Sequence, residues 1–110
     1  MEHRQTIRDF LLSNESAMFD LLRQMVEIQS YSFNKAGNDR MASLIARQME
    51  DLPVAVQEVG QDTVGRHLIV RSSATENFSA QILLAGHMDT VFPEDTTFTR
   101  YEEDGKVCRG

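Results

Sequence analysis

Two polar residues, His87 and Asp89, stand two positions apart directly after the segment 81–86, which is apolar from Ile82 onward. In extended backbone, side chains at positions i and i+2 point to the same side. An imidazole can bind a metal through one ring nitrogen while its other nitrogen donates a hydrogen bond to a carboxylate, which orients the ring. The spacing is therefore typical of half a metal site, although a structural or simply exposed histidine is the commoner use of such a residue.

The segment that must position this pair, Gln81–Gly86, is apolar at consecutive positions rather than at alternating ones. That pattern predicts a strand buried on both faces, as in a parallel sheet covered by helices. Open α/β sheets place their chemistry at the carboxyl ends of strands, which is where His87 and Asp89 would then lie. Pro93 closes the segment.

Three helices are expected before the strands. The first spans residues 5–12, Asn14 is expected to cap the second, and the third is expected to begin at Gly37 or Asn38 and to stop before Pro53. Residues 29–37 between the second and third helices are expected to form a loop. Apolar residues recur at helical spacing and predict two core-facing stripes. These are Met18, Leu21, Leu22, Met25 and Ile28, then Met41, Leu44, Ile45, Met49 and Leu52.

Strands are expected in the second half of the chain, and this order of elements indicates an α/β or α+β fold. The Asp104-Gly105 pair between two β-favouring runs predicts a hairpin turn. The β-favouring runs are 54–59, 65–71, 98–102 and 106–108, with a polar, turn-like stretch at 72–79.

Composition limits the classes of function. With 110 residues the chain is long enough for one small domain, and its net charge of −6 argues against a nucleic-acid-binding surface. The single cysteine, Cys108, fits a reducing compartment. The N-terminus lacks a signal-peptide core, and the apolar runs are too short to span a bilayer, so a cytoplasmic location without membrane partners is expected.

The segment Gly86-His87-Met88-Asp89-Thr90-Val91-Phe92-Pro93 closely resembles the first metal-site motif of the M20 family of zinc-dependent peptidases and deacylases. That family includes glutamate carboxypeptidases, acetylornithine deacetylases and succinyl-diaminopimelate desuccinylases. The stretches 22–30 and 104–107 look like further parts of the family's N-terminal region. The resemblance covers most of the chain, but only the His-x-Asp-Thr-Val segment is specific.

The resemblance implies that residues 1–110 form the N-terminal part of a single α/β catalytic domain with a mixed or largely parallel sheet. It implies a two-zinc site in which His87 is a ligand of one zinc, while Asp89 is the catalytic-site residue that orients His87. Such metals activate a water molecule that attacks an amide carbonyl. The implied substrates are small peptides or N-acyl amino acids, and a homodimer is expected for the full-length protein.

The chain departs from the family pattern in length. By resemblance, the remaining carboxylate ligands, the general-base glutamate and the inserted lid or dimerisation domain would follow Gly110. A catalytic zinc normally takes three protein ligands. We therefore expect at most one partial zinc site and no hydrolysis by this segment alone. The alternative is a non-catalytic α/β interaction module that binds a partner through an open surface.

Other reactive residues have simpler interpretations. His3 is expected to be exposed, His67 to serve packing or lie at the surface, and Cys108 to be a buried or edge residue rather than a nucleophile. The acidic run 102–104 is expected to be solvated, because its spacing does not match a calcium loop.

Overall fold

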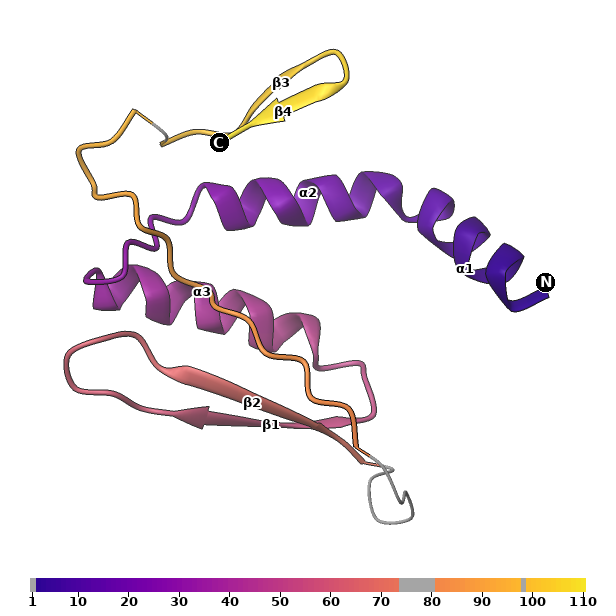
Figure 1. Cartoon of the computed structure of the whole chain (residues 1–110), viewed down its shortest axis with the longest axis horizontal. Coiled ribbons are helices and arrows are strands. Elements are labelled where there is room, and N and C mark those ends of the chain that lie inside the picture. The colour runs from indigo at the N-terminus through magenta and orange to yellow at the C-terminus, as the bar shows by residue number, and fades with distance from the viewer. Residues whose placement is uncertain (1, 74–80, 98) are drawn as a thin grey trace. The chain divides into compact units, whose positions relative to one another are not determined.

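The computed structural model describes residues 2–73, 81–97 and 99–110, and Figure 1 shows the order of the elements. The helices are α1 (Glu2–Ser13), α2 (Glu15–Val26) and α3 (Lys35–Gln48), and the strands are β1 (Val54–Val59), β2 (His67–Ser72), β3 (Glu102–Asp104) and β4 (Val107–Arg109). The contacts divide the chain into two compact units, residues 1–27 with 99–110 and residues 28–98. The expected mixed α/β composition is confirmed.

In the first unit, the break between α1 and α2 falls at Asn14, as the sequence predicts. The chemistry of the break differs from the prediction, because the Asn14 side chain makes no capping hydrogen bond to α2. Its Nδ2 instead donates to the Phe10 carbonyl oxygen at 2.8 Å. Asn14 therefore binds the last turn of α1, while Glu15 stands in the first turn of α2, where an acidic residue favours the helix dipole.

The apolar stripe of α2 has helical spacing, but its predicted burial is wrong. No described residue of α2 is buried, and the side chains of Met18 and Leu22 are 51% and 43% exposed. In the described part of this unit, only α1 and one short hairpin accompany α2. Two helices and a hairpin of this size offer too little apolar surface to cover the stripe.

The β3–β4 hairpin forms with its turn one residue later than predicted: Gly105 and Lys106 form the turn, while Asp104 belongs to β3 and lies opposite Val107. Gly105 has φ +59°, in the region that only glycine enters without steric cost, which explains the glycine at this position. Tyr101 next to β3 is buried, and the Arg23 guanidinium of α2 lies 4.7 Å from the centre of its ring. Phe98, in the predicted run 98–102, lies outside the described residues.

In the second unit, α3 begins two residues before the predicted Gly37 because Asn34 caps it. Asn34 Oδ1 accepts a hydrogen bond from the Gly37 N–H at 2.8 Å. Met41 and Leu44 are each only 4% exposed, so the predicted core stripe is confirmed in this part of the helix. Leu52, beyond the end of α3, is 51% exposed, and its predicted core position is wrong.

The strands β1 and β2 form an antiparallel pair that runs from Val54 opposite Ser72 to Val59 opposite His67. The bounds of β1 agree with the prediction, whereas β2 begins at His67 instead of Gly65. Helix α3 contacts β2, so the core of this unit lies between them (Figure 1). Of the predicted turn-like stretch 72–79, residues 74–79 lie outside the described part.

The predicted buried strand at 81–86 is wrong. The segment is extended without forming a strand, and Ile82, Leu83 and Leu84 are 91%, 88% and 90% exposed. Both sheets of the described chain are antiparallel and two-stranded, so they do not confirm the predicted mixed or largely parallel sheet. A strand covered on both faces needs neighbouring strands and helices, and no described strand pairs with this segment.

None of the helices in the described parts of the chain is long and apolar enough to cross a membrane.

Candidate functional site

The backbone around His87 and Asp89 is aligned by the loop 29–34, which precedes α3. Tyr31 and Thr90 form a parallel bridge. The Thr90 N–H donates to the Ser30 carbonyl oxygen at 2.8 Å, and the Ser32 N–H donates to the Thr90 carbonyl oxygen at 3.0 Å. These two bonds fix the register of the motif although the preceding segment 81–86 belongs to no sheet.

Two side chains of the same loop hold the residues that follow the motif. Gln29 Nε2 donates to the Phe92 carbonyl oxygen at 3.1 Å, and Asn34 Nδ2 donates to Glu94 Oε1 at 2.9 Å. Because Asn34 also caps α3, the motif is tied to the start of that helix. A side chain at Gly37 would collide with the Gln29 carbonyl oxygen, so glycine is needed for this close approach.

Ser32 holds the Asp89 carboxylate. Its Oγ donates to Asp89 Oδ2 at 2.5 Å, a length typical of a hydrogen bond to a charged oxygen. This bond first, and then the backbone of Asp89 and the His87 ring, hold the pKa of the Asp89 carboxyl below its ordinary value. The carboxylate is therefore ionised at neutral pH while its side chain is 42% exposed.

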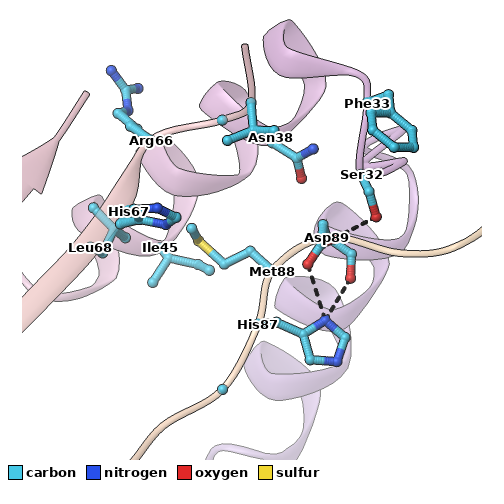
Figure 2. A pocket seen from close by; sticks show the side chains of 13 residues that line it. Ser32, Phe33, Asn38, Ile45, Arg66, His67, Leu68, His87, Met88 and Asp89 are labelled. Atoms are coloured by element: carbon cyan, nitrogen blue, oxygen red, sulfur yellow. Dashed lines mark hydrogen bonds and ion pairs between the residues drawn. The ribbon is translucent and has the colours of Figure 1, made fainter. Parts of the chain in front are cut away.

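His87 faces Asp89, as the i, i+2 spacing predicts, and Figure 2 shows the two interactions that join them. Nδ1 of His87 lies 2.9 Å from the Asp89 carbonyl oxygen and 3.2 Å from Asp89 Oδ1. A carbonyl oxygen only accepts hydrogen bonds, so this contact requires the proton on Nδ1. Nε2 then carries the free lone pair, and the His87 side chain is 82% exposed.

A cavity of about 510 Å³ opens beside this pair (Figure 2). Its polar lining comes from the loop before α3, from α3 itself, from β2 and from the motif. The polar residues of the lining are Ser32, Asn38, Arg66, His67, His87 and Asp89. The cavity thus gathers residues that are distant in sequence around the predicted site.

A zinc ion fits these residues only in part. His87 offers one imidazole nitrogen with its tautomer already set, which suits one position of a zinc site. Among the described residues, no group of three or more histidine, cysteine, aspartate or glutamate side chains could hold a metal ion. The described chain therefore offers one ligand and its orienting partner.

The other reactive residues lie as follows. His3 is exposed as expected, and His67 is exposed on β2 at the cavity wall. Cys108 is exposed on β4, and its Sγ lies 3.1 Å from the Tyr101 hydroxyl. Glu103 of the acidic run forms an ion pair with Arg23 at 3.4 Å, so this run is not merely solvated.

Sequence reasoning missed three residues of the site, namely Ser32, Asn34 and Asn38. Their signal is weak but readable. Ser30, Ser32 and Asn34 alternate through a loop without helical period, and side chains of this kind bind backbone groups in turns and at helix starts. Ser32 and Asn34 bind side chains more than fifty positions away, and nothing in the sequence around these two residues identifies those partners.

Comparison with known proteins gives no relative: no family model, no curated protein and no solved structure matches this chain.

Proposed function

We propose that His87 is one ligand of a zinc site in a metal-dependent hydrolase that cleaves amide bonds of small peptides or N-acyl amino acids. The observation that carries the proposal is the contact of His87 Nδ1 with the Asp89 carbonyl oxygen, which leaves Nε2 as the ligand atom. The resemblance of residues 86–93 to the first M20 metal motif supports the choice of zinc and of this substrate class.

Each residue of the pair has a separate task in this proposal. Asp89 orients the His87 ring through the contacts that its two oxygens make with Nδ1. Ser32 holds the Asp89 carboxylate in the position that faces the ring. Zinc, when bound, supplies an activated water and polarises the amide carbonyl. Two zinc ions are expected by resemblance, and the remaining ligands and the general base belong to other residues of the complete protein.

Zinc titration followed by NMR tests the ligand assignment, because the chain contains three histidines that serve as mutual controls. We expect weak binding in which the His87 ring signals respond first and the ¹⁵N shift of Nε2 moves most. The ring signals of His3 and His67 should respond only at higher zinc concentrations, since the described contacts include no oxygen that fixes the tautomer of either ring, as the Asp89 carbonyl oxygen does for His87. Equal responses of all three rings, or binding through Nδ1 of His87, would refute the assignment.

Activity is tested in the complete protein that carries this segment. We expect zinc-dependent release of amino acids from N-acetyl amino acids, with loss of one metal equivalent and of nearly all turnover in His87→Ala. His67→Ala removes a histidine from the same cavity wall and should keep the zinc content. Full zinc content in His87→Ala would contradict the proposal, and so would the absence of amide hydrolysis by a fully zinc-loaded protein.

The exposed segment 81–86 favours a second candidate, a non-catalytic interaction module. Ile82, Leu83 and Leu84 present about nine tenths of their surfaces to solvent, and the extended backbone suits pairing with a strand of another polypeptide. A chain of this kind would bind its partner without zinc, and alanine at His87 would leave that binding unchanged. Zinc dependence of binding therefore separates the two candidates.

A further inference from the structure

The cavity beside His87 contains a buried hydrogen-bond acceptor with no partner. Asn38 is only 5% exposed, and its Oδ1 makes no hydrogen bond within the described structure. Its Nδ2 donates to the Tyr31 carbonyl oxygen at 2.8 Å and to the Asn34 carbonyl oxygen at 3.1 Å. Exchange of the two amide atoms would place Oδ1 against two carbonyl oxygens, so the orientation of the amide is fixed.

A fixed acceptor of this kind is unusual in a folded protein. Buried polar groups are nearly always paired, and an unpaired one costs free energy comparable to a lost hydrogen bond. Figure 2 shows the Asn38 amide oxygen directed into the cavity. A bound molecule that donates a hydrogen bond at this point would satisfy it.

The backbone at Gly65 passes close to the base of the Asn38 side chain. Asn38 lies in the first turn of α3, and a side chain at Gly65 would collide with the Asn38 Cβ. The glycine allows the chain before β2 to pass directly against the helix. The acceptor is thus held in place by the two hydrogen bonds of its own amide nitrogen, on a residue against which the chain packs closely.

The rest of the lining combines one carboxylate, one guanidinium and two imidazoles with apolar side chains. The carboxylate is that of Asp89, whereas the guanidinium of Arg66, which also belongs to the lining, points away from the cavity in Figure 2. That guanidinium donates to the Asp39 carbonyl oxygen at 2.8 Å and pairs with the Glu58 carboxylate at 3.2 Å. The apolar lining includes Ile45, Val64, Leu68 and Met88.

We propose that this cavity binds a primary ammonium group carried on a short aliphatic chain. The ammonium donates a hydrogen bond to Asn38 Oδ1, Asp89 provides the opposite charge, and the aliphatic chain lies against Ile45 and Leu68. A volume of about 510 Å³ is within the usual range for small-molecule sites. The proposal does not depend on zinc, because none of these contacts uses Nε2 of His87.

Three probes of equal chain length separate the contributions of charge and hydrogen bonding. Isopentylammonium has both a charge and N–H donors, isopentyltrimethylammonium has only the charge, and isopentanol has a donor without charge. In NMR titrations of the metal-free chain we expect saturable binding of isopentylammonium in the millimolar range. The trimethylammonium probe and the alcohol should each bind at least about tenfold more weakly, since each lacks one of the two interactions.

Contacts and variants locate the bound probe. Intermolecular NOEs should connect its methyl groups with Ile45, Leu68 and Met88. Asn38→Ala should weaken binding about tenfold, and Asp89→Asn should weaken it as well. Asp62→Asn, which removes the same charge at an exposed position outside the cavity lining, should not.

Equal binding of the three probes would overturn the proposal. Absence of saturable shifts would do the same, because it means that only a water molecule satisfies Asn38 Oδ1. The comparison of probes on the unsubstituted chain decides the matter even where Asn38→Ala fails to fold.

Discussion

Ser32 Oγ donates a hydrogen bond of 2.5 Å to Asp89 Oδ2 across 57 positions of the chain. Asp89 in turn faces Nδ1 of His87 with both its carbonyl oxygen and its carboxylate. The orientation of the histidine therefore depends on the loop before α3 as well as on the motif itself. This relationship makes Ser32 a positioning residue, which acts on the proposed ligand only through Asp89.

Replacement of Ser32 by alanine should raise the pKa of Asp89 toward its ordinary value. The Ser32 hydroxyl is the largest cause of the lowered pKa, and its loss removes a donor that favours the ionised form. Carboxyl ¹³C shifts of Asp89 followed through a pH titration measure this change directly. Ser32→Thr retains a hydroxyl and should keep the pKa low, and an unchanged pKa in Ser32→Ala would contradict the positioning role.

Replacement of Asp89 by asparagine should reduce the affinity of the proposed site for zinc by roughly 10–100-fold, as the loss of an orienting carboxylate does. We expect the lower end of this range, because the Asp89 carbonyl oxygen remains 2.9 Å from His87 Nδ1 and still fixes the tautomer. Competition with a chromophoric chelator measures the affinity. Asp62→Asn is the matched control for charge, and equal zinc affinities in the two variants would count against the orienting role of Asp89.

Local signals predicted much of the fold. Helical spacing located the helices, and the bounds of β1 agreed with its β-favouring residues. The Asp104-Gly105 pair located the second hairpin to within one residue, because Gly105 adopts a positive φ in a turn formed by Gly105 and Lys106. Burial was predicted less well, because it depends on what covers a face. The apolar residues of α2 and of the run 81–86 are spaced as in buried helices and strands. In the described chain, however, no helix or strand packs over them closely enough to bury them.

The candidate site shows the same division between local and distant interactions. His87 and Asp89 are brought together by backbone geometry over two positions, which a sequence reveals. The bond from Ser32 to Asp89 and the approach of Gly65 to Asn38 join separate segments. Only the folded backbone brings those segments together. The sequence therefore could not predict the hydrogen bond from Ser32 to the Asp89 carboxylate or the unpaired Oδ1 of Asn38.

Asp39 should make the stability of the second unit depend on pH. Its Oδ2 accepts from Lys35 Nζ at 2.9 Å and its Oδ1 from the Arg66 N–H at 2.9 Å, and these bonds, that of Lys35 first, lower its pKa. A lowered native pKa stabilises the fold above the ordinary pKa of about 3.9, and this stabilisation disappears as pH falls through the native pKa. Urea midpoints measured at successive acidic pH values should therefore fall less steeply in Asp39→Asn.

The control for this prediction is Asp62→Asn, which removes an exposed aspartate from the same unit and should keep the acid dependence of the unsubstituted chain. Identical dependence in Asp39→Asn and in the unsubstituted chain would show that the bonds from Lys35 and Arg66 do not stabilise the ionised form.

The exposed segment 81–86 should cause the chain to associate with itself at high concentration. Unpaired extended backbone with three consecutive apolar side chains, Ile82 to Leu84, is a template for pairing with a second copy. Leu83→Lys should reduce this association in sedimentation velocity experiments. Gln81→Lys adds the same charge to the same segment without removing an apolar side chain.

Charge alone would act in the opposite direction, because either lysine brings the net charge of −6 closer to zero and weakens the repulsion between copies. Gln81→Lys should therefore associate at least as strongly as the unsubstituted chain, while Leu83→Lys becomes monomeric. A clean monomer of the unsubstituted chain at high concentration would contradict the prediction, since it would require the apolar side chains at 82–84 to be covered within the chain itself.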